Sequence, residues 1–116
     1  MPTKMGFQPC LDTITPVRDA IDVINGKWKL SIIISVVKGN ERFTDIQASI
    51  PGITPKVLAN ELKVLEQHQL LRRVVVEDYP VKILYQAEPY ANTLIPIIEA
   101  LKEWGLVHRK RIFEQT

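Results

Sequence analysis

The residues best suited to chemistry are short polar groups and lysines at the start of one predicted helix. Thr54, Lys56 and Asn60 lie near its N-terminal end, and Lys63 continues the same side. Hydroxyl, ammonium and amide groups of this kind can hydrogen-bond to base edges or phosphates when the first turns of a helix enter the major groove of DNA. The same residue types are typical of a helix face that meets only water, so the pattern alone leaves both interpretations open.

Side chains for catalysis or metal binding are sparse. His68 and His108 have no partner at metal-ligand spacing, and one cysteine is too few for a structural zinc site. The sequence also lacks a glycine-rich phosphate loop, a Ser-His-Asp or Cys-His set and paired carboxylates at a plausible cleft. We therefore expect a protein that is not an enzyme and that uses no metal or other cofactor.

Length and composition fit one folded domain spanning residues 1–116. The chain is 46% hydrophobic and 24% charged, which excludes a disordered or low-complexity chain. No apolar stretch suits a membrane span, no secretory signal is visible, and a single cysteine, Cys10, cannot form an internal disulfide. These features predict a cytoplasmic protein without a membrane partner. The net charge is only +2, so an anionic partner must meet a local basic patch.

The elements that position the polar side chains must be short, because proline and glycine interrupt the chain repeatedly. After an N-terminal arm, residues 1–14, the first helix is predicted over residues 15–25, since Thr15-Pro16 is a cap followed by proline at the first helical position. Residues 27–37 are apolar on nearly all sides. A buried strand is a local alternative there, but the length of the segment favours a buried helix.

Residues 44–68 are predicted to form two helices joined by the tight turn Pro51-Gly52-Ile53, close to the roughly three- to four-residue turn of a helix-turn-helix. Thr54-Pro55 repeats the helix-start signal at the second helix. Alternating apolar residues then predict a β-hairpin over residues 70–87. A hairpin directly after the second helix is a wing. The fold class expected is therefore mainly α with a small antiparallel hairpin (α+β), a winged helix-turn-helix.

A last helix is predicted over residues 89–114, and Pro96 should kink it or weaken one turn. Its main apolar stripe is followed by further apolar residues on other faces, such as Leu106 and Val107. A helix with more than one apolar face needs a partner beyond its own domain. Dimerisation satisfies that need, and a protein–protein interaction module without direct DNA reading is the rival interpretation.

Basic side chains outside the second helix add to the candidate DNA surface. Arg73 and Lys82 on the hairpin can reach a neighbouring phosphate or the minor groove. Arg42 precedes the first helix of the motif, where phosphate can dock on a helix N-terminus; the alternative is a surface charge paired with Glu41 or Asp45. The predicted DNA-binding residues are Arg42, Thr54, Lys56, Val57, Asn60, Lys63, Arg73 and Lys82.

These segments together resemble the HxlR-type winged helix-turn-helix transcriptional regulators. The resemblance extends over residues 15–105 and is carried by Ile24-Asn25-Gly26-Lys27-Trp28, Arg42-Phe43, the segment Pro51 to Leu58, and Trp104-Gly105. It implies a homodimeric bacterial regulator that binds double-stranded DNA at an operator near a promoter, with the first and last helices forming the dimer. The interface residues expected are Val17, Ile21, Ile24, Leu94, Ile98, Leu101 and Trp104.

The chain departs from this family pattern at two places. Several members respond to oxidants through a cysteine near the start of the first helix, but the family's Cys-Pro position reads Thr15-Pro16 here, and Cys10 lies five residues upstream. A thiol-based redox sensor at Cys10 is thus an alternative rather than the main hypothesis. In the second helix, Ala59-Asn60-Glu61 replaces a Thr-Gln-Arg-like run. We expect a weaker phosphate grip there, with Glu61 solvated or paired with Lys63; the operator and the effector do not follow from the sequence.

Overall fold

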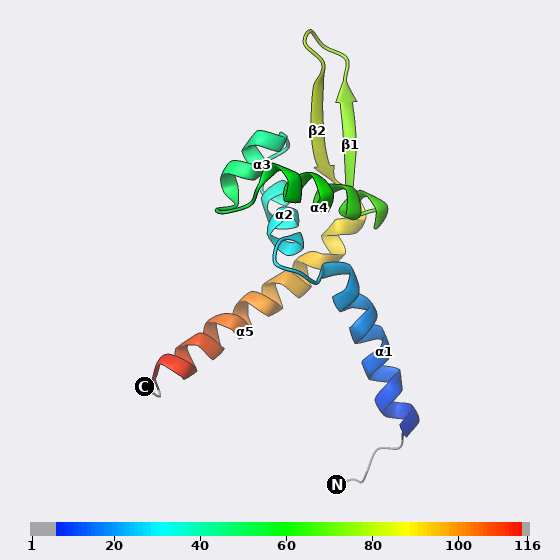
Figure 1. The fold of residues 1–116 in the computed structure, drawn as a ribbon. Helices are drawn as coiled ribbons and strands as arrows, with labels where there is room; N and C mark the ends of the chain where they lie inside the picture. The colour runs from blue at the N-terminus through cyan, green and yellow to red at the C-terminus, as the bar shows by residue number, and fades with distance from the viewer. Residues whose placement is uncertain (1–6, 115–116) are drawn as a thin grey trace.

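The computed structural model describes residues 7–114, and the side chains of residues 10–114. The described chain is mainly helical with one antiparallel hairpin, which confirms the predicted fold class (Figure 1). In chain order the elements are α1 (Phe7–Ile24), α2 (Lys29–Val37), α3 (Phe43–Ser49), α4 (Pro55–Gln67), β1 (Leu71–Val76), β2 (Lys82–Ala87), the 3₁₀ helix η1 (Pro89–Leu94) and α5 (Ile95–Glu114).

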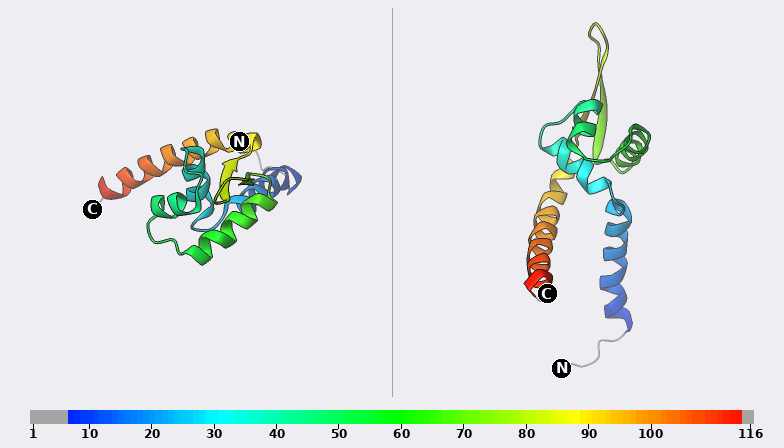
Figure 2. Two further views of the ribbon diagram at one scale, coloured as in Figure 1. Left: turned by 90° about the horizontal axis from the view of Figure 1, so that it is seen from above. Right: turned by 60° about the vertical axis from the view of Figure 1, so that its left-hand side comes forward.

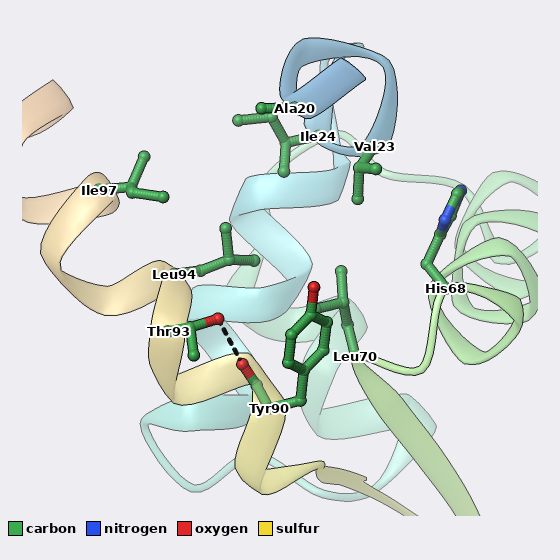
Figure 3. A pocket seen from close by; sticks show the side chains of 9 residues that line it. All are labelled: Ala20, Val23, Ile24, His68, Leu70, Tyr90, Thr93, Leu94 and Ile97. Carbon is green, nitrogen blue, oxygen red and sulfur yellow. Dashed lines mark hydrogen bonds between the residues drawn. The ribbon is translucent and has the colours of Figure 1, made fainter. Parts of the chain in front are cut away.

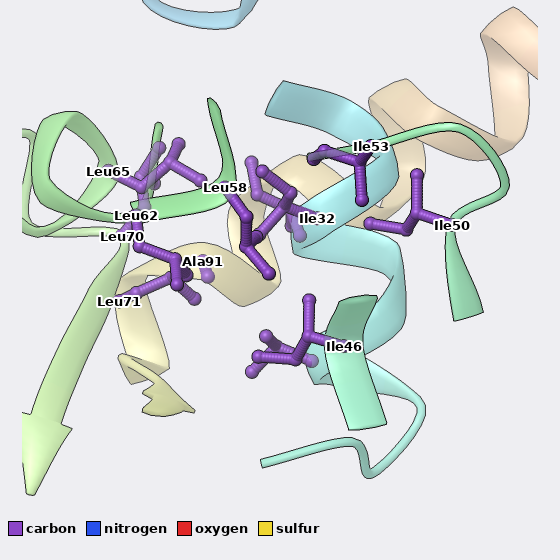
Figure 4. Close-up of a cluster of buried hydrophobic side chains, with 12 residues drawn as sticks. Ile32, Ile46, Ile50, Ile53, Leu58, Leu62, Leu65, Leu70, Leu71 and Ala91 are labelled. Carbon is purple, nitrogen blue, oxygen red and sulfur yellow. The ribbon is translucent and has the colours of Figure 1, made fainter. Parts of the chain in front are cut away.

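The hydrophobic core lies where α2, α3 and α4 meet the base of the hairpin (Figure 4). Residues 29–37, for which the sequence favoured a buried helix over a strand, form the buried helix α2, and Ile32 and Ile33 are fully enclosed. Burial of a large aliphatic side chain contributes about 1.5–3 kcal/mol each, so these residues hold the three helices together. The buried set is Ile32, Ile33, Val36, Ile46, Ile50, Ile53, Leu58, Leu62, Leu65, Leu70, Leu71 and Ala91.

A tight turn joins α3 to α4, as the sequence predicted. The amide of Ile53 donates to the carbonyl of Ile50 at 3.3 Å, and Gly52 has a φ of +87°. Proline in the second position and a left-handed glycine in the third are typical of a type II turn. The turn therefore requires Gly52 for its backbone conformation, and it sets the direction in which α4 leaves α3.

The hairpin projects from the helical body and is anchored only at its base (Figure 1). Its register runs from Leu71 opposite Ala87 to Val76 opposite Lys82, and Leu71 is buried while Val75 is exposed. At the base, the amide of Tyr85 donates to the carbonyl of Glu41 at 2.7 Å. This bond ties β2 to the segment that leads into α3, so the wing and the helix-turn-helix are held side by side.

The first helix begins earlier than predicted. It runs from Phe7, so Thr15 and Pro16 lie inside α1 instead of starting it. A proline in a helix interior removes one backbone hydrogen bond, and α1 continues through that loss in its exposed middle. Residues 7–14 of the predicted N-terminal arm are therefore helical, and residues 1–6 of it lie outside the described part of the chain.

Pro96 marks a boundary at the other end of the chain. The predicted single helix is divided into η1 and α5, and Pro96 stands in the first turn of α5, where a helix needs no amide donor. The proline therefore ends the 3₁₀ segment and starts an α-helix. The rest of α5 is continuous through Glu114.

Helices α1 and α5 extend away from the body as two arms (Figures 1 and 2). The principal extents of the molecule are 66 × 39 × 23 Å and its radius of gyration is 18.1 Å, against about 13 Å for a compact chain of this length. No helix in the described residues has the length and apolar character needed to cross a membrane. The arms carry a series of exposed apolar side chains, namely Leu11, Ile14, Val17, Ile21, Ile97, Leu101, Trp104, Leu106, Val107, Ile112 and Phe113.

Replacing the turn glycine gives the first prediction. Gly52→Ala places a Cβ on a left-handed residue, so the free energy of unfolding should fall by about 1–2 kcal/mol in urea denaturation. Gly105→Ala is the matched control, because Gly105 lies within α5 and an added Cβ would meet no atom within 4 Å apart from the neighbouring backbone of its own helix. That change should stabilise the protein by about 0.5–1 kcal/mol. Equal effects of the two changes would contradict the turn assignment.

Candidate nucleic-acid interface

The outer face of α4 carries the polar residues that the sequence singled out. Lys56, Asn60 and Lys63 are three or four positions apart and exposed, and the opposite face of the helix is buried in the core through Leu58, Leu62 and Leu65. Residues at this spacing lie on one side of a helix. In the described part of the chain, neither lysine nor Asn60 forms an ion pair or a side-chain hydrogen bond. Their donors are therefore available to an external partner.

The start of α4 is fixed by a side-chain cap. Thr54 Oγ1 accepts a hydrogen bond from the amide of Val57 at 3.2 Å, and Pro55 occupies the first helical position. The cap-then-proline signal at this helix is confirmed. Thr54 is exposed, whereas the side chain of Val57 is half-buried against the core. Of these two predicted contact residues, Thr54 presents its side chain outward and Val57 mainly supports the helix.

The environment of Glu61 differs from the prediction. Glu61 was expected to be solvated or paired with Lys63, but its carboxylate accepts hydrogen bonds from Lys29 Nζ at 3.1 and 3.3 Å. The two side chains are only 14% (Lys29) and 17% (Glu61) exposed. The reason is position: Glu61 lies on the side of α4 that faces the start of α2, away from Lys63. Its negative charge is therefore neutralised inside the protein and does not oppose phosphate at the exposed face.

The two hairpin residues predicted to bind DNA, Arg73 and Lys82, differ in their contacts. Arg73 is exposed and has no ion pair in the described residues. Its neighbour Arg72 is engaged with Gln86 at 3.2 Å and with Glu88 at 3.9 Å. Lys82 is paired with Asp78 at 3.5 Å, but both groups are about half exposed. A surface pair of this kind contributes little energy, so a phosphate can replace Asp78.

Arg42 lies beside the hairpin at the start of α3. Its backbone is extended, and it precedes the first helical residue without a side-chain cap. Within residues 10–114 it forms no ion pair with Glu41 or Asp45. Arg42 and Lys82 line one groove of about 430 Å³ between the α3 start and the hairpin tip. The structure thus brings together cations that are distant in sequence.

The residues predicted for the dimer interface fall into two groups. Val17, Ile21, Leu101 and Trp104 are exposed on the arms. Leu94, Ile98 and Ile24 are half-buried, and the first two pack against the core of their own chain. Cys10, the candidate redox residue, is a free thiol exposed on α1.

A cavity of about 360 Å³ lies at the base of the two arms. Figure 3 shows side chains from α1, the end of α4, η1 and α5 around it, with Thr93 Oγ1 donating to the carbonyl of Tyr90 at 2.6 Å. Most of its lining is apolar: Ala20, Val23, Ile24, Leu70, Leu94 and Ile97, with His68, Tyr90 and Thr93 at the edge. The arms therefore meet the body at an incompletely filled junction.

Sequence reasoning did not identify Lys29 as the ion-pair partner of Glu61 on α4. Lys29 follows the Gly-Lys-Trp segment that the resemblance used, yet no periodicity in the sequence links it to Glu61, 32 positions away. The one available sign of a buried ion pair was that the apolar helix α2 begins with a lysine. It does not name the partner, because ion pairs between helices depend on how the helices pack.

Comparison with known proteins places the chain among helix-turn-helix regulators. The family model described as HxlR-like helix-turn-helix matches residues 23–113. The HTH-type transcriptional regulator YdeP of Bacillus subtilis is 33% identical over 84% of this chain and 76% of its own length. A regulator from Methanothermobacter thermautotrophicus is 35% identical, with coverage of 79% and 70%.

Solved structures give the same result for the fold. The reduced form of the redox regulator HypR has a TM-score of 0.78 and 34% identity, and the alignment covers 87% of this chain and 99% of that chain. A MarR-family regulator from Enterococcus faecalis has a TM-score of 0.78 and 28% identity, with coverage of 89% and 94%. The reduced form of YodB from B. subtilis has a TM-score of 0.71 and 30% identity, with coverage of 77% and 87%. These neighbours confirm a winged helix-turn-helix.

The cap of α4 gives the second prediction. Thr54→Ala removes the acceptor for the amide of Val57, so the free energy of unfolding should fall by about 1 kcal/mol. Thr54→Ser keeps the acceptor and should stay close to the parent in the same urea titration. If serine lost as much stability as alanine, the hydroxyl would not be the group that starts α4.

Proposed function

The chain belongs to the HxlR-like helix-turn-helix family of transcriptional regulators, and on that premise we propose that it binds an operator near a promoter as a homodimer. The observation that carries this proposal is the exposed face of α4, where Lys56, Asn60 and Lys63 have no partner within the described residues. A helix held by one apolar face and open on the other fits the major groove, which is about 12 Å wide.

In this proposal α4 is the recognition helix. Thr54, Lys56 and Asn60 lie in its first half and face outward, so they reach base edges when the N-terminal end enters the groove. Asn60 can pair with adenine through two hydrogen bonds, and a lysine can donate to guanine. Lys63, one turn further on, is placed to meet the phosphate backbone.

The wing and the start of α3 supply the contacts to phosphate. Arg42 and Lys82 line one groove beside the hairpin, and Arg73 is an exposed cation on the other face of the hairpin. The net charge of the chain is only +2, so these local cations, and not the whole molecule, attract DNA. Each neutralised phosphate releases counterions and makes binding weaken as salt rises. Binding to chromosomal DNA would place the protein in the cytoplasm.

The arms are the proposed dimer interface. Val17 and Ile21 on α1, and Leu101 and Trp104 on α5, expose apolar surface that the body of the same chain does not cover. Extended apolar surface of this kind marks a protein–protein contact. A two-fold pairing of the arms would set two α4 helices about 34–36 Å apart, or a multiple of that distance, to match successive turns of DNA.

A mobility-shift titration tests DNA recognition directly. The protein should bind a duplex from the region upstream of its own gene more tightly than random duplex, and both affinities should fall along a salt series. Asn60→Ala should change base preference at one position and cost about 1–3 kcal/mol there. Lys82→Ala should weaken binding to all duplexes alike and lower the salt slope by about one. Equal affinity of the parent protein for both duplexes would refute specific binding.

Light scattering tests the interface. Leu101→Asp puts a charge into the proposed contact between arms, so we expect monomers and loss of tight operator binding. Val75→Asp is the matched control, because Val75 on the wing and Leu101 are both 49% exposed, and this variant should stay dimeric. A dimeric Leu101→Asp protein would locate the interface elsewhere.

A further inference from the structure

An ion pair joins the recognition helix to the start of α2. Lys29 Nζ lies 3.1 Å from one carboxylate oxygen of Glu61 and 3.3 Å from the other. Both side chains are more than four-fifths buried. The other ion pairs described lie on the surface of the hairpin or within α5. This pair is therefore the one that relates the position of α4 to another helix of the body.

We propose that the Lys29–Glu61 pair is a positioning device that sets the rotation of α4 about its own axis, and so decides which base edges Asn60 and Lys56 reach. Lys29 is then a specificity-determining residue that does not touch DNA. The inference rests on the proposed function, since it concerns how the same helix reads sequence.

The argument begins with the difference between apolar and polar contacts. Leu58, Leu62 and Leu65 hold α4 against the core, but burial of apolar surface is non-directional, so it permits small rotations of the helix. A short ion pair that is mostly buried holds its two charged groups together, because separating them leaves a charge unpaired away from water. Successive residues are about 100° apart around a helix. Holding Glu61 inward therefore fixes the direction in which Asn60 points.

The position of Lys29 in the chain strengthens this role. It is the first residue of α2, directly after the short segment that joins α1 to α2, in which Gly26 is left-handed with a φ of +98°. A Cβ on Gly26 would lie 3.9 Å from Lys29 Nζ, and one on Gly52 would lie 3.9 Å from the ring of Trp28. The segment thus contacts the helix-turn-helix turn through Trp28 and the recognition helix through Lys29.

The experiment first uses the parent protein to select a preferred duplex from a random library. Four variants are then compared by one ratio, the affinity for this preferred duplex divided by the affinity for random duplex. Lys29→Met should lower this ratio by about tenfold, because the unpaired carboxylate turns toward water and α4 rotates. Glu61→Gln should lower it in the same direction. The exchanged variant K29E/E61K should restore both the ratio and the base-substitution profile. Lys63→Met is the control, which should weaken both duplexes equally and lower the salt slope by about one.

A purely structural pair gives a different pattern. Urea denaturation of Lys29→Met and Glu61→Gln then shows lost stability, but the ratio stays at the parent value, and that result would overturn the positioning role. Failure of K29E/E61K to restore the ratio would overturn it as well. If Lys29→Met does not fold, Glu61→Gln decides the matter, since glutamine keeps the shape of the side chain. A parent protein with no preferred duplex would instead refute the proposed function itself.

Discussion

Burial of one face of α4 against α2 is the constraint on which the candidate surface depends. Leu58, Leu62 and Leu65 are enclosed, and the isoleucines Ile32 and Ile33 of α2 are part of the same core. At about 1.5–3 kcal/mol for each buried side chain, these contacts far exceed any single surface ion pair, which contributes up to about 1 kcal/mol. Apolar burial therefore keeps α4 in place and leaves its polar face to the solvent.

Polar side-chain contacts between helices then set how the helices are rotated relative to one another. Two such contacts, one to α3 and one to α4, both involve α2. Ser35 Oγ lies 2.6 Å from Ser49 Oγ, and Asn40 Nδ2 donates to Ser35 at 3.1 Å, which fixes α2 relative to α3. Lys29 does the same for α4. Apolar packing alone permits several relative orientations of these helices. A few polar bonds within the small core then select one orientation.

The parts of the fold that sequence reasoning found are those with local causes. The cap at Thr54-Pro55 and the alternation of the hairpin are set by neighbouring residues, so the order of helix, turn, helix and wing could be predicted. The same local signal misled at Thr15-Pro16, since a proline is also tolerated inside a longer helix. The partner of Glu61 could not be predicted, because it depends on how two helices pack.

The extended shape of the domain comes from its two arms, α1 and α5. Leu94 and Ile98 at the root of α5 pack against the core of the same chain, whereas Leu101 and Trp104 beyond them do not. One end of α5 is thus fixed by the body, and the other exposes apolar side chains that the described part of the chain does not cover. Through residues 26–29, the opposite arm is connected directly to the turn and to α4. In the proposed homodimer, pairing of the arms would set the spacing of the two α4 helices and the Lys29–Glu61 pair would set the rotation of each, and recognition of an operator would require both.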